Sequence, residues 1–281
     1  MRTSLGILAV LTLSTGWSSA GIGQTTAPPA GRGGTWTSPK QAGRPALKTR
    51  PSGDAAIVRT VADAMGFVRG LGRGETTDTL NRLQWFGAGT MTENGRRYVV
   101  TKYSYAMSLS LNGAREDLQR RPMVGGATER LVYAYLGADA WNETTPGVGA
   151  TPAPDPTKLR RLQFLRTPFG FTKALLQLQP GTATITDPGP GQRITIAAML
   201  EGVPFLATLD PDYRPASIVI DVDGHTIGTT YAQYRDLHEY GVMFPTRIAD
   251  TVDGRPTRTL AIDDGRVASY LILQPPSRSG S

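Results

Sequence analysis

Apolar and polar residues alternate with a period of two along most of the chain, and this pattern predicts an antiparallel sheet. Residues 83–105 read as two strands around Asn94-Gly95, a dipeptide that suits the positive backbone angles of a tight hairpin turn. Similar runs continue over residues 106–114, 129–144 and 182–273. Further turns are predicted at Gly137-Ala138-Asp139, Asp210-Pro211-Asp212, Asp223-Gly224, Asp253-Gly254 and Asp264-Gly265. We therefore expect a meander of about ten to twelve strands.

Two segments depart from this period and predict helices. Ile57, Val61, Met65 and Val68 are spaced as on one face of a helix, behind a candidate cap at Asp54 and before a run of glycines. Residues 157–180 mix basic and large apolar side chains, and their second half, from residue 172 onward, has helical character.

A meander of this length either closes into a barrel or stays open as a strongly curved sheet with helices over its concave face. The two helical segments favour the second arrangement. We predict an α+β, mainly β, fold: an incomplete antiparallel β-barrel whose helices cover the concave face. Such a sheet would leave an apolar cavity beneath the helices.

The ends of the chain predict export. Residues 1–20 have the positive start, short apolar core and small-residue cleavage site of a signal peptide. Residues 21–52 are rich in Gly, Pro and Thr and predict a disordered leader, and residues 276–281 predict a flexible tail. The folded domain should span residues 53–275, with a mobile loop insertion at 145–156 and the helical insertion at 157–180. We expect a periplasmic or secreted protein with neither a lipid anchor nor a transmembrane helix in its mature chain.

The composition limits the chemistry further. The chain has no cysteine, which removes disulfides, thiolate nucleophiles and cysteine metal sites. The formal net charge is +7, carried by 25 arginines and 5 lysines that are scattered along the chain and not clustered in one stripe. This distribution argues against nucleic acid and leaves an anionic membrane surface or a merely solvated basic surface as alternatives.

Familiar catalytic and cofactor motifs are absent from the sequence, and we predict no enzyme activity, no cofactor and no metal site. The two histidines, His225 and His238, could meet on neighbouring strands and share a metal with an aspartate, but no third soft ligand exists in the chain. A hydrolase that depends on one of these histidines stays a minor alternative.

Several motifs resemble a known family of bacterial exported proteins, related to the lipoprotein carriers LolA and LolB. The family's hairpin with tyrosine-arginine and phenylalanine-proline elements resembles residues 231–236 (YAQYRD) followed by 241–248 (GVMFPTRI). Its strand, turn and tryptophan resemble residues 131–143 (LVYAYLGADAWNE). Its arginine- and leucine-rich helical insertion resembles residues 159–176. The resemblance covers residues 54–273. It implies an incomplete antiparallel barrel with helices across its mouth and a periplasmic lipid or lipoprotein binder.

Aromatic and leucine side chains are the candidate ligand contacts. The resemblance suggests a helical lid around Phe164, Phe169, Phe171, Leu175 and Leu178, with Trp85, Tyr103 and Tyr231 as walls of a cavity. Filling the core is the simpler role for any one of these residues, and only a residual cavity would change that reading.

These observations support an exported monomer that binds acyl-chain lipids or lipoproteins in a half-barrel cavity, as a carrier or sensor in the cell envelope. The alternative is a non-catalytic structural or protein-interaction module of the envelope. An apolar cavity of a few hundred cubic ångströms would favour a small ligand, and a solid core with an exposed apolar patch would favour a protein partner.

Overall fold

The structure, a computed structural model, describes residues 50–67, 80–267 and 269–276. In these ranges it contains three helices, α1 (Asp54–Met65), α2 (Thr157–Arg166) and α3 (Pro168–Gln177). The strands in the same ranges are β1 (Arg82–Glu93), β2 (Arg96–Ser108), β3 (Gly113–Pro122), β4 (Glu129–Leu136), β5 (Asp139–Glu143), β6 (Thr151–Pro152), β7 (Ala183–Thr186), β8 (Thr195–Leu200), β9 (Val203–Leu209), β10 (Pro215–Val222), β11 (His225–Arg235), β12 (Phe244–Val252) and β13 (Arg255–Val267). The predicted signal peptide, most of the predicted leader and all but the first residue of the predicted tail lie outside the described residues.

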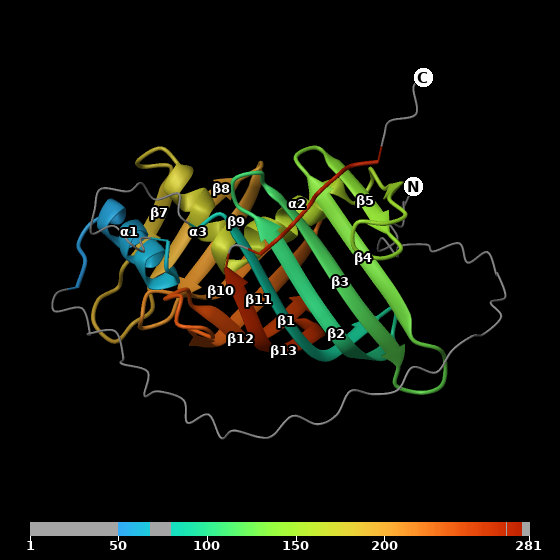
Figure 1. The fold of residues 1–281 in the computed structure, drawn as a ribbon. Coiled ribbons are helices and arrows are strands. Elements are labelled where there is room, and N and C mark those ends of the chain that lie inside the picture. Colours follow the sequence, from blue (N-terminus) through green and yellow to red (C-terminus); the bar gives the residue numbers. More distant parts are fainter. Residues whose placement is uncertain (1–49, 68–79, 268, 277–281) are drawn as a thin grey trace, which may run out of the picture. The chain divides into compact units, whose positions relative to one another are not determined.

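The thirteen strands form one antiparallel sheet that does not close into a barrel. Its order is β6-β5-β4-β3-β2-β1-β13-β12-β11-β10-β9-β8-β7. The first and last strands therefore meet in the middle of the sheet, and β6 and β7 form its two edges. Since α2 and α3 connect β6 to β7, they must cross from one edge to the other, and they do so over the concave face (Figure 1). This arrangement confirms the predicted fold class.

Several hairpin turns lie where the sequence predicts them. Asn94-Gly95, Asp223-Gly224 and Asp253-Gly254 each adopt positive φ at both positions. Turns with this geometry match the right-handed twist of the flanking strands and fix a two-residue connection. The register of β1 with β2, of β10 with β11 and of β12 with β13 is therefore specified locally.

One predicted turn is wrong. Asp264 and Gly265 lie inside β13, opposite Phe86 and Trp85 of β1. A Cβ at Gly265 would come within 2.8 Å of the ring of Phe244, so glycine here makes room for an aromatic ring. Glycine is needed here because the Phe244 ring packs closely against the backbone, and not because the chain reverses direction. The strand therefore continues through this position.

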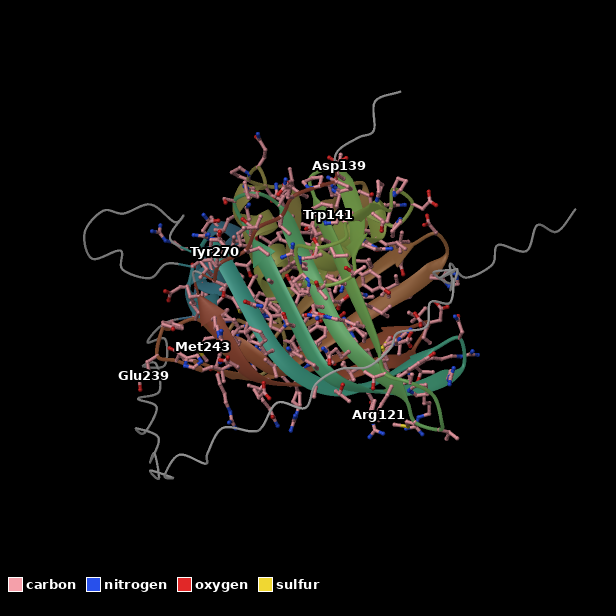
Figure 2. All side chains as sticks on the ribbon, turned by 45° about the vertical axis from the view of Figure 1, so that its right-hand side comes forward. Arg121, Asp139, Trp141, Glu239, Met243 and Tyr270 are labelled. Carbon is pink, nitrogen blue, oxygen red and sulfur yellow. The ribbon has the colours of Figure 1, made fainter. Side chains whose placement is uncertain are left out.

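The last described segment does not form the predicted continuation of the strand pattern. After β13 ends at Val267, residues 269–276 cross the outer face of the sheet in front of β3 and β4 (Figure 1). Arg115 Nη2 donates to the Ile272 carbonyl at 2.8 Å. Tyr270 in this segment is 84% exposed (Figure 2). The alternation of apolar and polar residues over 266–273 therefore continues past Val267, where the last strand ends.

β3 is the strand that the period-two pattern does not predict. Its sequence, GAREDLQRRP, is mostly polar. Yet Glu116, Asp117 and Arg120 are all buried, because each pairs with a charge on another strand. Asp117 accepts two hydrogen bonds from Arg130 of β4, at 2.8 and 2.7 Å. Ion pairing therefore allows charged side chains to be buried at positions that a hydropathy pattern assigns to the surface.

The predicted first helix is present, with one correction at its start. Ile57, Val61 and Met65 are buried as the spacing indicates, while Val68 lies outside the described residues. Asp54 is the first helical residue and not the cap, since Gly53 occupies the cap position without a side-chain hydrogen bond. No helix in the described ranges combines the length and the apolar character needed to span a bilayer.

The predicted loop insertion 145–156 is held to β5. The Thr144 amide donates to the Val148 carbonyl at 3.0 Å, and the Gly147 amide donates to Glu143 Oε2 at 2.5 Å. Glu143 also accepts from the Trp141 indole at 2.7 Å. This buried carboxylate is therefore the anchor of the turn on the outer face. Mobility of the insertion stays a prediction.

Candidate functional site

A sharp elbow lets α2 and α3 follow each other across the concave face. Thr167 separates them in an extended conformation; its hydroxyl donates to the Phe164 carbonyl at 2.7 Å and accepts from the Gly170 amide at 3.0 Å. Pro168 begins α3, where the N–H that proline lacks would have no helical partner. A Cβ at Gly170 would lie 2.0 Å from the Phe164 carbonyl oxygen. The elbow therefore requires glycine at this position.

The helix begins at Thr157, the first residue of the predicted helical insertion, although the sequence pattern shows helical character only from residue 172 onward. The reason is Arg160, which faces the sheet and breaks the apolar stripe of α2. Its guanidinium is buried, donates to carbonyl oxygens of β4 and β5 at 2.9 and 2.6 Å and to Asn142 Oδ1 at 2.5 Å, and lies over the ring of Tyr133. An inward arginine thus fixes α2 to the sheet through polar contacts.

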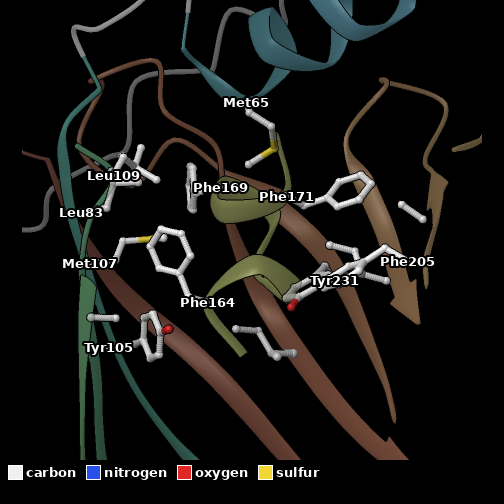
Figure 3. Packing of buried hydrophobic residues seen from close by; sticks show 14 of the residues in the cluster. Met65, Leu83, Tyr105, Met107, Leu109, Phe164, Phe169, Phe171, Phe205 and Tyr231 are labelled. Atoms are coloured by element: carbon white, nitrogen blue, oxygen red, sulfur yellow. The ribbon is translucent and has the colours of Figure 1, made fainter. Parts of the chain in front are cut away.

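The eight predicted site residues come together on the concave face under α2 and α3. The buried members, with exposed fractions of 0 to 6%, are Trp85, Tyr103, Phe164, Phe169, Phe171, Leu175 and Tyr231. Leu178 is partly buried against the same cluster. They belong to a larger cluster of buried apolar side chains, in which Phe164, Phe169, Phe171 and Tyr231 lie beside residues such as Met65 and Phe205 (Figure 3). Their role in binding a ligand stays a prediction.

Aromatic rings connect the helices to both halves of the sheet. Phe169 packs with its centroid 5.9 Å from that of Trp85 and 5.5 Å from that of Phe244. Phe171 points to the opposite side of α3, toward Phe205, at 6.4 Å (Figure 3). Aromatic pairs of this kind contribute about 0.5–1.5 kcal/mol each beyond the area they bury. The inner side of the helices is therefore tightly packed.

A pocket of about 310 Å³ remains beside the helices. Phe164 and Leu178 are the predicted site residues that line it. The full lining is Asn112, Tyr135, Gly137, Arg161, Phe164, Leu165, Ala174, Gln177, Leu178, Met199, Leu200 and Glu201. The pocket thus lies between α2, α3, β4 and the β8–β9 hairpin. The predicted set of site residues does not include Tyr135, Arg161 or Met199, because their convergence depends on contacts between distant segments of the chain.

Exposed polar contacts fasten the outer edges of α2 and α3. They are Lys158 with Asp223 at 3.2 Å, Arg161 with Glu201 at 2.5 Å, and Lys173 with Asn112 at 3.1 Å. Exposed ion pairs contribute about 0–1 kcal/mol each. The helices are therefore fastened weakly at the solvent side and packed tightly at the core side.

A buried ionic cluster lies farther along the concave face. Arg258 contacts Glu116 at 2.5 Å and Asp250 at 2.7 Å, and Arg166 lies 4.0 Å from Asp250. Burial alone would raise the pKa of Asp250, but Arg258 and Arg166 outweigh it and lower that pKa below its usual value. The cluster therefore stays ionised at neutral pH and joins β3, β12 and β13.

Two buried tyrosines, Tyr103 and Tyr105, and the partly buried Tyr133 lie near this cluster. Burial, followed by the nearby Glu116 carboxylate, raises the pKa of Tyr103 and Tyr105 well above the usual value and that of Tyr133 to about 12. These hydroxyls are therefore protonated and uncharged at neutral pH.

The two histidines do not come together. His225 Nδ1 lies 2.8 Å from Asp253 at the start of β11, and His238 Nε2 lies 2.5 Å from Asp264 beyond the other end of that strand. Neither histidine lines the pocket. Among the described residues, no group of three or more histidine and carboxylate side chains is placed to hold a metal ion.

Comparison with solved structures finds matches at low sequence identity and low TM-score. A LolA superfamily protein from Nitrosomonas europaea is 11% identical with a TM-score of 0.42, over 77% of this chain and 94% of that one. LprF from Mycobacterium bovis is 9% identical with a TM-score of 0.34, over 80% and 100%. A porin-like protein from Bacteroides uniformis is 11% identical with a TM-score of 0.24, over 67% and 96%. No protein-family model matches the chain, and no curated protein matches it.

Proposed function

We propose that this protein binds the hydrocarbon chain of a lipid or lipoprotein in the pocket beside α2 and α3, and that the two helices act as a lid. The observation that carries the proposal is the contrast between the two sides of the lid. Its inner side is aromatic and borders a pocket of about 310 Å³ with both apolar and polar lining residues, whereas its outer side is held by exposed polar contacts.

The free energy gained when an acyl chain is buried can be compared with the free energy of the three exposed contacts at the outer edge of the lid. The three edge contacts together contribute at most about 3 kcal/mol. Each methylene of a chain that leaves water gains about 0.8 kcal/mol, so about four buried methylenes match all three contacts. A medium-length acyl chain therefore supplies enough free energy to offset the three edge contacts.

The size of the pocket limits what binds without a shift of the lid. A volume of about 310 Å³ is at the lower end of the roughly 300–1,000 Å³ of small-molecule pockets. One short chain fits this space. A lipoprotein anchor with several chains requires Phe164 and Leu178 to move, after which Trp85, Tyr103 and Tyr231 become the walls of the enlarged site.

A role in the cell envelope accords with the predicted signal peptide and with the resemblance to lipoprotein carriers. The basic net charge, and Lys158, Arg161 and Lys173 on the lid, favour approach to an anionic membrane surface. We propose that the mature protein is an exported monomer that carries or senses its ligand without catalysing a reaction.

Mass spectrometry of co-purified lipids tests this proposal. The mature chain is purified without detergent, extracted with organic solvent, and its extract is compared with that of a Leu178→Glu variant, whose charge at the pocket should exclude a chain. We expect an acyl-chain compound in stoichiometric amount from the wild type and little from the variant. Absence of any such compound, together with failure to take up added fatty acids, would refute the proposal.

A protein-interaction module is the second candidate, favoured by an exposed apolar row on the outer face of β8 and β9. Met199 and Leu206 are 60% and 48% exposed, and their cross-strand neighbours Pro204 and Ala197 extend the row. Exposed apolar patches of this kind often mark protein contacts. This second function holds instead if the wild type takes up no acyl chain and if Leu206→Lys abolishes a measured association with an envelope protein.

A further inference from the structure

Tyr135 on β4 carries a buried hydroxyl that has no hydrogen-bond partner among the described residues. The residue is 3% exposed. Two other tyrosines show the usual arrangement: the buried Tyr231 donates to the Arg166 carbonyl and the partly buried Tyr234 to the Pro215 carbonyl, each at 2.6 Å. A buried hydroxyl without a partner is unfavourable because it has lost its hydrogen bonds to water. The unpaired state of Tyr135 therefore needs an explanation.

The position of Tyr135 supplies one, because its ring forms part of the pocket wall. The ring stands edge-on to that of Phe164, at a centroid distance of 5.9 Å. Burial, the main cause, raises the pKa of Tyr135; Arg161 lowers it and Glu201 raises it. Tyr135, Arg161 and Glu201 all line the same pocket.

We propose that the Tyr135 hydroxyl is the hydrogen-bond donor of a polar subsite in this pocket, and that the ligand is a small single-chain amphiphile whose carbonyl oxygen accepts that hydrogen bond. The apolar wall around Phe164, Leu165 and Leu178 takes the chain, and Tyr135 determines where the chain's polar end lies. This inference rests on the proposed function. It adds a preference for esters or carboxylic acids over plain hydrocarbons.

The two sources of a carbonyl oxygen are distinguishable. A carboxylate carries charge and competes with Glu201 for Arg161, which lies 2.5 Å from Glu201 in the structure. An ester carries no charge and leaves that ion pair intact. Binding of a carboxylate should therefore weaken with salt, whereas binding of an ester should not.

Competition binding tests the subsite. The neutral fluorophore N-phenyl-1-naphthylamine is displaced from the full mature chain by methyl decanoate, decanoic acid or undecane. We expect the wild type to prefer a carbonyl compound over undecane by roughly two- to tenfold, the range of one net hydrogen bond. Tyr135→Phe should remove this preference and leave the affinity for undecane unchanged. Tyr234→Phe, the control, should keep the preference.

Thermal unfolding of the empty protein gives an independent readout. Tyr135→Phe deletes an unpaired hydroxyl and should unfold at the same temperature as the wild type or above it. Tyr234→Phe leaves the Pro215 carbonyl without its donor and should unfold at a lower temperature. A lower unfolding temperature for Tyr135→Phe would show that its hydroxyl is already satisfied in the empty protein and would overturn the inference.

The outcomes separate the inference from the proposed function. If undecane and methyl decanoate bind equally well to the wild type, chain binding stands and the polar subsite is wrong. If Tyr135→Phe keeps the full preference for the ester, the donor is another residue and the inference is again wrong. If no probe is displaced, both the function and the subsite fail.

Discussion

Replacing Phe164 by alanine should weaken the fold and strengthen ligand binding at the same time. Phe164 is 3% exposed, lines the pocket and packs edge-on against Tyr135. Truncation of a buried phenylalanine costs about 3–5 kcal/mol of unfolding free energy. The volume that it vacates adds directly to the pocket, so the same change should admit a longer chain.

The expected gain in affinity follows from the buried methylenes. If the enlarged pocket accepts two more methylenes, the binding free energy improves by about 1.6 kcal/mol, or roughly fifteenfold. A saturating ligand at about 100 times its dissociation constant should return about 2.7 kcal/mol of stability to the variant. Most of the loss caused by the substitution should therefore be recovered when a fatty acid of sufficient length is present.

Phe171→Ala is the matched control for this experiment. Phe171 is fully buried on the other side of α3, against Phe205, and does not line the pocket. Urea unfolding with and without fatty acids of increasing length measures both effects. We expect both variants to lose similar stability and only Phe164→Ala to gain affinity for longer chains. Equal rescue of both variants, or rescue of neither, would refute the assignment of this pocket as the chain site.

Three further predictions concern the lid and the ionic cluster. Gly170→Ala should disrupt the elbow, since its Cβ would lie 2.0 Å from the Phe164 carbonyl oxygen, and circular dichroism should show a lower unfolding temperature. Arg161→Glu should accelerate ligand release in stopped-flow measurements by repelling Glu201, and a second change of that glutamate to arginine should restore the wild-type rate. The arginine neighbours of Asp250 lower its pKa, so this carboxylate stabilises the fold above its unfolded pKa of about 3.9. This stabilisation is lost as the pH falls through the folded pKa of Asp250. Denaturation measured at a series of pH values should show this loss of stability in acid for the wild type and a smaller loss for Asp250→Asn.

Local signals in the sequence predict much of the architecture. Dipeptides such as Asn94-Gly95 specify hairpins through their own backbone preferences, and the buried positions of α1 follow a helical period. The open sheet with a helical cover also follows from the sequence, because a long meander interrupted by one helical segment has few ways to protect its concave face. These features depend on neighbours in the chain, which a single sequence records.

Features that depend on distant partners are the ones that the sequence does not predict. Glu116 becomes an interior residue only because Arg258 lies beside it in the folded sheet. Gly265 is read as a turn because the ring of Phe244 that requires it is distant in sequence. In the same way, Arg160 breaks the apolar stripe of α2 while forming three hydrogen bonds to β4 and β5. In each case tertiary contacts override the local pattern.

Some residues of the candidate site are predictable from the sequence, and others depend on distant partners. Phe164 and Leu178 combine bulk with a place in the helical insertion, which the sequence shows, and they line the pocket. Tyr135 is marked out by a fully buried hydroxyl without a hydrogen-bond partner, and that depends on the folded neighbourhood. An aromatic pattern therefore predicts the region of the proposed site and not its proposed polar subsite.

The strand order itself limits how ligand can enter. Since β6 and β7 are opposite edges of the sheet and α2 and α3 connect them, the lid is tied to the sheet at both ends and cannot swing away. Arg160 holds α2 to β4 and β5, whereas the pocket lies toward α3 and the β8–β9 hairpin. The side of the lid that faces the hairpin is therefore the side with fewer buried polar contacts. Opening should begin there, by a tilt that separates Arg161 from Glu201 and leaves the contacts of Arg160 intact.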